Sequence, residues 1–162
     1  MRTLVGVIVG LLVGVGAGHF LWRGHGDGHV ASAADLAGIE KLHQEDIDVT
    51  LTQDPKGLTE IWAQDGVRVA PDGAVVVGKT AIGADNAKFR EANPEFKVMK
   101  YAPDLEHFSV AMADGWELEV GTLSATFKLS GKDDPVSMNI KTLRLLQRQP
   151  DGAWEFALVE LK

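Results

Sequence analysis

The 162-residue chain contains no cysteine, and this absence excludes a disulfide framework, a thiolate zinc site and cysteine-based catalysis. Basic residues are scarce, since 16 lysines and arginines stand against 23 aspartates and glutamates and leave a formal net charge of −7. A nucleic-acid-binding face needs positive charge to neutralise phosphates, so this balance argues against a nucleic-acid partner. With 45% apolar residues, the chain is too hydrophobic to be disordered and is long enough for one compact domain.

Local motifs of several enzyme classes are also missing from the sequence. There is no glycine-rich phosphate-binding loop, no Gly-x-Ser-x-Gly nucleophile elbow and no His-Glu-x-x-His metal helix. The acidic pair Asp133-Asp134 is too short a cluster for a calcium loop. No motif indicates a cofactor, so any chemistry has to rest on separate polar side chains.

Charge is almost absent from the first 22 residues, where residues 4–22 form an apolar run broken only by His19. At about 1.5 Å per helical residue, this run is roughly 28 Å long, close to the hydrocarbon thickness of a bilayer. It is either an uncleaved signal anchor, which the long spacer after it favours, or a signal peptide cleaved near Ala33. Because Arg2 precedes the run, both alternatives place the remaining chain on the periplasmic or extracellular side, tethered to the membrane or secreted.

Residues 23–34 alternate glycine with polar and small residues, which is typical of a flexible linker. His25, Asp27 and His29 within it could bind a metal ion. The intervening glycines make such a site costly to order, and a solvated linker is the interpretation that we prefer.

The folded domain is expected over residues 35–162, where all six prolines lie at boundaries between periodic segments. Helices are expected at residues 35–52, 54–62 and 80–93, and strands at residues 67–70, 75–77, 96–112, 116–129, 136–149 and 154–161. Asp35 is a suitable N-cap of the first helix, and Trp62 is expected on the buried face of the second. The segment 96–112 contains one or two strands, because Pro103 lies within it.

The long strands are expected to form an antiparallel meander, with Asp114-Gly115 as a hairpin turn and Gly121 as a bulge. Glu117 and Glu119 alternate with apolar residues, which predicts that one face of the sheet is solvated. The order of elements therefore predicts an α+β fold, in which three helices pack on one face of a strongly curved antiparallel sheet.

The order of these elements and the residues at their boundaries resemble those of the nuclear-transport-factor-2-like superfamily, in its SnoaL-like and ketosteroid-isomerase-like branch. The matching segments, in order, are Gln53-Asp54, Leu58 with Ile61-Trp62-Ala63-Gln64-Asp65, Ala70-Pro71-Asp72-Gly73, Gly78-Lys79 with Ile82, and Asp151-Gly152-Ala153-Trp154-Glu155-Phe156. The resemblance covers roughly residues 35–162. It implies a cystatin-like, cone-shaped sheet with three helices that enclose a pocket, here preceded by one hydrophobic N-terminal helix. It also implies a homodimer formed through the outer face of the sheet.

The resemblance does not extend to the residues that ketosteroid isomerases use. Ala70 stands at the position of the general base, and alanine cannot accept a proton. Asp46 stands at the position of the oxyanion-binding phenol, where an ionised carboxylate repels an oxyanion. The partner acid falls near Thr142 or Arg144. We therefore expect no steroid isomerase activity.

Three polar residues remain as candidate catalytic groups. Asp46 faces the pocket by the resemblance, and His43 precedes it by one helical turn, so the two form a candidate acid–base pair. Strict alternation along the last strand places Glu160 on the pocket side too, although a residue so near a strand end can also reach solvent. The alternative for the helix is a solvated face, because much of it is acidic.

Four apolar residues are candidates for the lining of the pocket. Trp154, Phe156 and Leu158 share one face of the last strand, and Trp62 either lines the pocket or fills the core.

Three functions are compatible with these observations. The first is an exported or membrane-tethered domain that binds a small, largely apolar molecule. The second is a lyase or isomerase of the same fold that uses Asp46 with His43 or Glu160. The third is a non-catalytic dimerisation or association module.

Overall fold

The structure, a computed structural model, describes residues 31–162, apart from the side chains of residues 106–113. Within this range the helices are α2 (Ala33–Thr52), α3 (Gly57–Glu60) and α4 (Lys79–Ala92). The strands are β1 (Trp62–Val69), β2 (Val75–Val77), β3 (Lys97–Ala113), β4 (Trp116–Lys128), β5 (Val136–Arg148) and β6 (Trp154–Leu161). The predicted apolar span, residues 4–22, and the linker up to residue 30 lie outside the described residues. No helix within residues 31–162 combines the length and apolarity that crossing a membrane requires.

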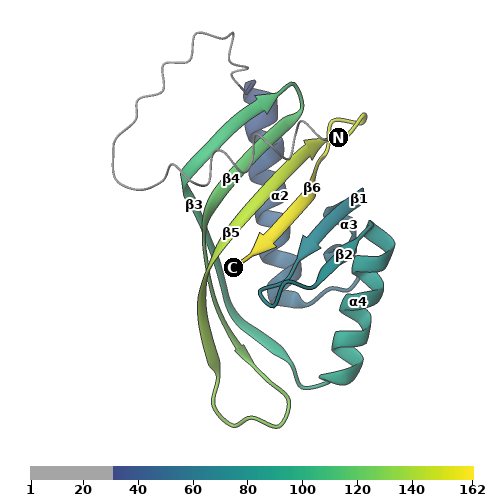
Figure 1. Cartoon of the computed structure of the whole chain (residues 1–162), viewed down its shortest axis with the longest axis vertical. Coiled ribbons are helices and arrows are strands. Elements are labelled where there is room, and N and C mark those ends of the chain that lie inside the picture. The colour runs from purple at the N-terminus through teal and green to yellow at the C-terminus, as the bar shows by residue number, and fades with distance from the viewer. Residues whose placement is uncertain (1–30) are drawn as a thin grey trace.

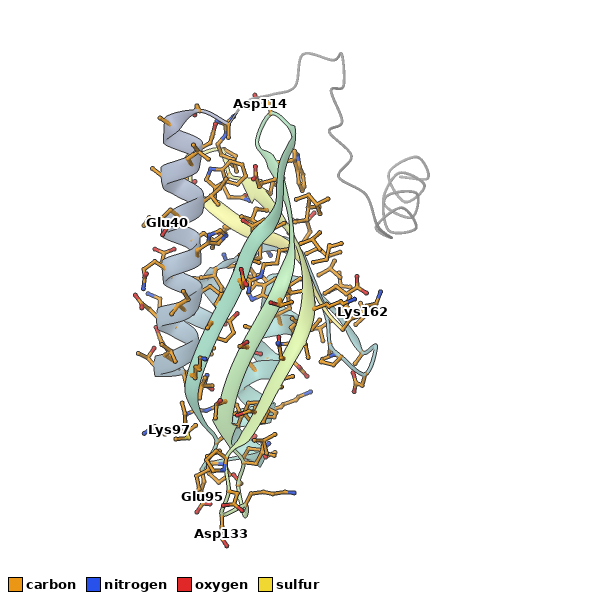
Figure 2. All side chains as sticks on the ribbon, turned by 90° about the vertical axis from the view of Figure 1, so that its left-hand side faces the viewer. Glu40, Glu95, Lys97, Asp114, Asp133 and Lys162 are labelled. Carbon is orange, nitrogen blue, oxygen red and sulfur yellow. The ribbon has the colours of Figure 1, made fainter. Side chains whose placement is uncertain are left out.

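All the described strands join one curved sheet in the order β2-β1-β6-β5-β4-β3 (Figure 1). The prediction of a curved α+β fold is confirmed, but the prediction of a purely antiparallel sheet is wrong because β1 and β6 run parallel. Figure 2 shows α2 lying along one face of β3–β5, with no described helix against the other face. We call the face toward α2 the inner face and the opposite one the outer face.

The first helix begins two residues before the predicted N-cap. Ser32 is the N-cap, its Oγ accepts a hydrogen bond from the Asp35 backbone N–H at 3.1 Å, and the Asp35 carboxylate accepts one from the Ser32 backbone N–H at 3.1 Å. This reciprocal capping box satisfies two N–H groups that a helix start otherwise leaves unpaired. Asp35 therefore has a capping role, but from the first turn of the helix.

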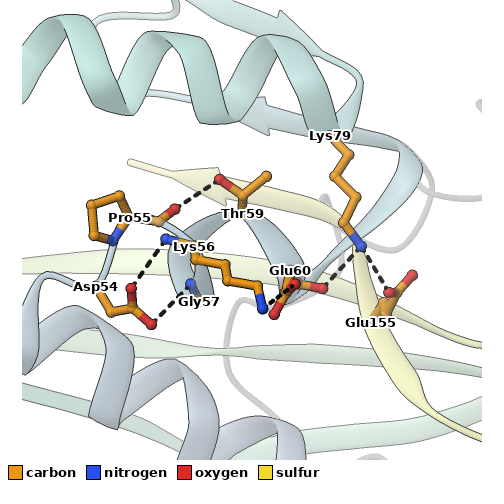
Figure 3. A network of polar contacts seen from close by, with 8 residues as sticks. All are labelled: Asp54, Pro55, Lys56, Gly57, Thr59, Glu60, Lys79 and Glu155. Carbon is orange, nitrogen blue, oxygen red and sulfur yellow. Dashed lines mark hydrogen bonds and ion pairs between the residues drawn. The ribbon is translucent and has the colours of Figure 1, made fainter.

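A short polar network holds α3 between its neighbours (Figure 3). The Asp54 carboxylate accepts hydrogen bonds from the backbone N–H groups of Lys56 and Gly57, both at 3.1 Å. At the other end, the Lys79 ammonium donates to the Glu60 carbonyl and to Glu155, both at 3.0 Å, which links α3, α4 and β6. The helix ends before Trp62, so the prediction that Trp62 lies on this helix is wrong.

The main apolar core lies where α2, α3 and α4 meet β1, β5 and β6. Its members are Ile39, Leu42, Ile61, Trp62, Ile82, Leu146, Trp154 and Phe156. The rings of Trp62 and Phe156 are 5.9 Å apart and tilted by 56°, a favourable geometry for aromatic packing. The three helices and the central strands therefore pack together around one hydrophobic core.

Gly121 marks the point at which the long strands bend. The register between β3 and β4 shifts between Asp104 and Phe108, so the bulge lies on β3, opposite the position at which it was predicted. A Cβ at Gly121 would collide with the carbonyl oxygen of Asp104. Glycine is required here because the β3 backbone crosses so close to β4.

A second bulge changes which side chains of β6 face α2. Phe156 pairs with Leu146, but Leu158 pairs with Leu145, so one residue of β6 is unpaired between them. Directly paired residues point to the same face of a sheet. Leu158 and Glu160 consequently lie on the outer face, and the alternation that placed Glu160 on the pocket side is wrong.

Candidate functional site

Asp46 is the centre of a buried hydrogen-bonded triad on the inner face. Its Oδ2 accepts hydrogen bonds from the hydroxyl of Tyr101 on β3 at 2.8 Å and from Nη1 of Arg144 on β5 at 3.1 Å. Nη2 of Arg144 also donates to the Tyr101 oxygen at 3.1 Å, which closes the ring of contacts. Asp46 is only 6% exposed and Arg144 1% exposed. The triad therefore joins α2 to two strands, with Asp46 and Arg144 buried and Tyr101 half-buried.

The charges of this triad are strongly perturbed. Burial raises the pKa of Asp46 above its ordinary value, against the opposing effects of Arg144 and Tyr101. Burial and the neighbouring Asp46 carboxylate raise the pKa of Tyr101, so its hydroxyl keeps its proton. Burial disfavours the charge on Arg144, but the attraction of Asp46, Tyr101 and Glu119 holds its pKa above the ordinary value.

His43 contacts a different acid from the one predicted. Its Nε2 lies 2.7 Å from Oε1 of Glu119, although the ring N–H is not aimed along that line. Glu119 lies directly opposite Arg144 on the neighbouring strand, and it is 2% exposed. The prediction that Glu117 and Glu119 lie on a solvated face is wrong, because both are buried on the inner side.

Five buried polar side-chain atoms on the inner side of the described sheet have no well-formed hydrogen bond, and one of them, Trp154 Nε1, belongs to the main core. The other four are His43 Nε2, Glu119 Oε2, Thr142 Oγ1 and Arg144 Nε. An unpaired buried polar group costs about 1–3 kcal/mol, so four in one region are unusual unless something else pairs with them. We use the name inner polar cluster for His43, Asp46, Tyr101, Glu119, Thr142 and Arg144.

The inner polar cluster borders apolar surface on two sides. Above it, the Arg144 guanidinium lies 5.3 Å from the centre of the Phe156 ring, which belongs to the main core. Below it, the inner face continues with Leu123 and Ala125, both buried, which pair with Ile140 and Met138. A molecule bound at the cluster would meet polar groups at one end and apolar side chains around the rest.

The structure separates the residues that the sequence grouped as a site. His43 and Asp46 remain together on α2, and both belong to the inner polar cluster. Trp62, Trp154 and Phe156 lie in the main core. Leu158 and Glu160 lie on the outer face, where Glu160 forms an ion pair with Lys162 at 2.8 Å.

Tyr101 and Glu119 are the site residues that sequence reasoning missed, and it named Arg144 only as one alternative for a family position. The signal in the sequence was ambiguous, because charged residues alternating with apolar ones are typical of a half-solvated strand. Pairing Glu119 with Arg144 would have pointed to a buried pair, but that pairing requires the register of β4 and β5.

The described residues do not form a metal site. Among the described side chains, those of residues 31–105 and 114–162, no group of three or more histidines, aspartates or glutamates is arranged to hold a metal ion. The candidate ligands His25, Asp27 and His29 lie outside the described residues.

Comparison with known proteins identifies the fold as that of nuclear-transport-factor-2-like proteins. A ketosteroid isomerase-like protein from Erwinia carotovora atroseptica superposes with a TM-score of 0.67 at 18% identity, over 80% of this chain and 96% of that protein. An NTF2-like protein of unknown function in nutrient uptake from Rhodospirillum rubrum gives 0.62 at 18% identity, over 76% and 96%. A domain of unknown function with a cystatin-like fold from Nostoc punctiforme gives 0.63 at 15% identity, over 81% and 78%.

Sequence comparison adds no family or activity to this likeness. No family model matches the chain, and no curated protein matches it. At such identities the structural neighbours define a shared fold, and a fold of this kind hosts many unrelated functions. Function therefore has to be argued from the inner polar cluster.

Proposed function

We propose that this domain binds a small, largely apolar molecule between α2 and strands β3–β5, with one polar group of that molecule at the inner polar cluster. The observation that carries the proposal is the set of four buried polar atoms without hydrogen-bond partners. Interiors leave few such atoms unpaired, and a ligand that supplies the missing partners recovers the cost of burying them. The apolar residues Leu123 and Ala125 beside the cluster suit the rest of such a ligand.

Native mass spectrometry of the protein purified from its own source tests this proposal. We expect a bound small molecule, and we expect Thr142→Val to reduce its occupancy because the variant removes one unpaired hydroxyl while it keeps the side-chain volume. Thr122→Val is the matched control, since Thr122 lies on the outer face of the neighbouring strand. A protein that carries no ligand and binds none from an extract of its source would contradict the proposal.

Acid–base catalysis on the bound molecule, as a lyase or isomerase, is the second candidate. The contact of His43 with Glu119 favours it, because histidine and carboxylate side chains held together are the residue types that serve most often in general acid–base catalysis. Asp46, whose pKa burial raises, is the second proton-carrying group within the cluster. In this proposal Glu160 has no part, because it lies on the outer face.

Association through the outer face is a further proposal, and the pairing of the strands supports it. Two rows of paired residues cross that face. The first is apolar throughout and consists of Val77, Val67, Leu158, Leu145 and Leu118. The second consists of Val75, Val69, Leu143 and Val120, and Glu160 interrupts it between Val69 and Leu143. Val75 and Val77 are exposed, and Leu143, Leu145 and Leu158 are partly exposed. An apolar sheet face of this extent suits a homodimer.

The sequence supports export of this domain by residues 4–22. The intact mass of the native protein reports whether residues 1–33 are retained. An enzymatic reporter fused after Lys162 reports the side of the membrane, and cytoplasmic activity would contradict export.

A further inference from the structure

The arrangement of the unpaired atoms defines what kind of polar group the cluster accepts. We infer that this group is uncharged and both donates and accepts hydrogen bonds, as a hydroxyl or a carboxamide does, and that carboxylates and phosphates are rejected. The inference rests on the proposed binding function, and it goes further by naming the chemical class of the ligand's polar end.

The three unpaired strand residues lie close together because of their register. Glu119 on β4 is directly opposite Arg144 on β5, and Thr142 is two residues away on the same strand and the same face. Opposite side chains have Cβ atoms about 5 Å apart, and residues two apart along a strand are about 7 Å apart. The three residues are therefore neighbours on the inner face, and the inferred polar group lies among them.

The unpaired atoms form a mixed set of donors and acceptors. Oε2 of Glu119 can only accept a hydrogen bond while the carboxyl is ionised, and the Nε–H of Arg144 can only donate one. The Thr142 hydroxyl can do both. A complementary group must donate to Glu119 and accept from Arg144, which a hydroxyl or a carboxamide does and a carboxylate does not.

The charge of the cluster also disfavours an anion. Arg144 already directs Nη1 at Asp46 and Nη2 at Tyr101, so the two-pronged face that usually binds a carboxylate or phosphate is occupied. Asp46 and Glu119 carry two carboxyl groups against this one guanidinium. An anion would therefore lie beside the Glu119 carboxylate in a region of low dielectric, while both Nη atoms of Arg144 are directed at Asp46 and Tyr101 and the His43 ring lies against Glu119 itself.

Three probes that share one aromatic ring test this inference on the full chain: benzamide, benzyl alcohol and benzoate. Their dissociation constants are measured at pH 7.5 by protein-observed NMR titration. We expect benzamide and benzyl alcohol to bind at least about tenfold more tightly than benzoate. We also expect the largest shifts at the backbone amides of residues 119, 142 and 144.

Glu119→Gln isolates the contribution of the carboxylate. It removes the charge while keeping the shape, so we expect the preference over benzoate to fall by about threefold or more. Glu160→Gln is the matched control, since it removes a carboxylate from the outer face and should leave all three affinities unchanged. If Glu119→Gln does not fold, Thr142→Val replaces it and should weaken benzamide and benzyl alcohol more than benzoate.

The outcomes separate this inference from the proposed function. If benzoate binds as tightly as benzamide, or more tightly, the inference that the ligand's polar group is uncharged is wrong, while the proposal of small-molecule binding stands. If none of the probes binds and no ligand is retained from the source, the proposed function itself fails. If the probes bind but shift only residues of the outer face, the inner polar cluster is not the site.

Discussion

Nε2 of His43 on α2 lies 2.7 Å from Oε1 of Glu119 on β4, and this contact connects the long helix to the middle of the sheet. The same pair adjoins Arg144, which faces Glu119 across the strands and holds Asp46 on the helix. Two acids, one guanidinium and one imidazole are thus enclosed together. Within this group, burial raises the pKa of the Asp46 carboxyl, so Asp46 is the member whose protonated form the fold favours.

Removing the Tyr101 hydroxyl tests the structural part of this network. Tyr101→Phe leaves Asp46 and Arg144 each without one hydrogen bond inside the protein. We expect the free energy of unfolding to fall by about 1–3 kcal/mol, measured by urea denaturation monitored by circular dichroism. A loss below about 0.5 kcal/mol would mean that the triad does not form in solution.

The stability contribution of Asp46 should decrease as the pH rises. Its pKa is raised by burial above the ordinary value of 3.8, so the folded state favours the protonated form. The stabilisation that protonated Asp46 provides is fully present below about pH 4, near its unfolded-state pKa. Between that pKa and the higher folded-state pKa, the stabilisation falls by about 1.4 kcal/mol for each unit by which the pH rises. The measurement is the unfolding free energy of the wild type minus that of Asp46→Asn, from pH 3.5 to pH 8.

Asp46→Asn is a suitable reference because it does not titrate and retains every other ionisable group. The difference between the two proteins therefore isolates Asp46. A difference that grows with pH would show that the attraction of Arg144 outweighs burial, and that the carboxylate is the stable form in the fold.

Much of this fold could be predicted from the sequence because its boundaries are marked locally. Asp54-Pro55, Pro71-Asp72-Gly73 and Asp151-Gly152 each end an element for reasons that act within a few residues. The parallel pairing of β1 with β6 could not be predicted in this way, since it joins residues more than 90 positions apart in the sequence, such as Val67 and Leu158. It depends on the shared core around Trp62 and Phe156.

The candidate site was predicted only in part, and the bulges explain the rest. A single unpaired residue of β6 moves Leu158 and Glu160 from the inner to the outer face, because side chains alternate with a period of two. Conversely, Glu119 alternates as a solvent-facing residue would, and only its pairing with Arg144 and its contact with His43 account for its burial. Asp46 was expected on the inner side from the family resemblance, and His43 was placed beside it because helical spacing is a local property.

Gly38 should not tolerate even alanine. A Cβ at this position would lie 2.5 Å from Cδ1 of Trp154, which packs beneath α2. Alanine normally stabilises a helix by about 1 kcal/mol relative to glycine, but overpacking here should reverse the sign and cost about 1–3 kcal/mol. Urea denaturation measures the change.

The double variant Gly38→Ala with Trp154→Ala is the control for this prediction. Alanine has no Cδ1 atom, so the collision is removed and the cost of Gly38→Ala should shrink or change sign in that background. An equal cost in both backgrounds would show that Trp154 is not what excludes the Cβ.

A charge placed in the first, apolar row of the outer face should abolish self-association. Leu145 lies in the middle of the first row, between Leu118 and Leu158, so a proposed two-fold interface would bury it. We expect the wild type to sediment as a dimer and Leu145→Glu as a monomer, because a buried unpaired carboxylate costs several kcal/mol. Leu36→Glu is the matched control, since Leu36 is exposed on α2, away from this face. A dissociation constant of about 100 μM corresponds to an association free energy of about −5.5 kcal/mol. A wild-type protein that stays monomeric at about this concentration would contradict the dimer proposal. It would not affect the proposal of ligand binding on the inner face.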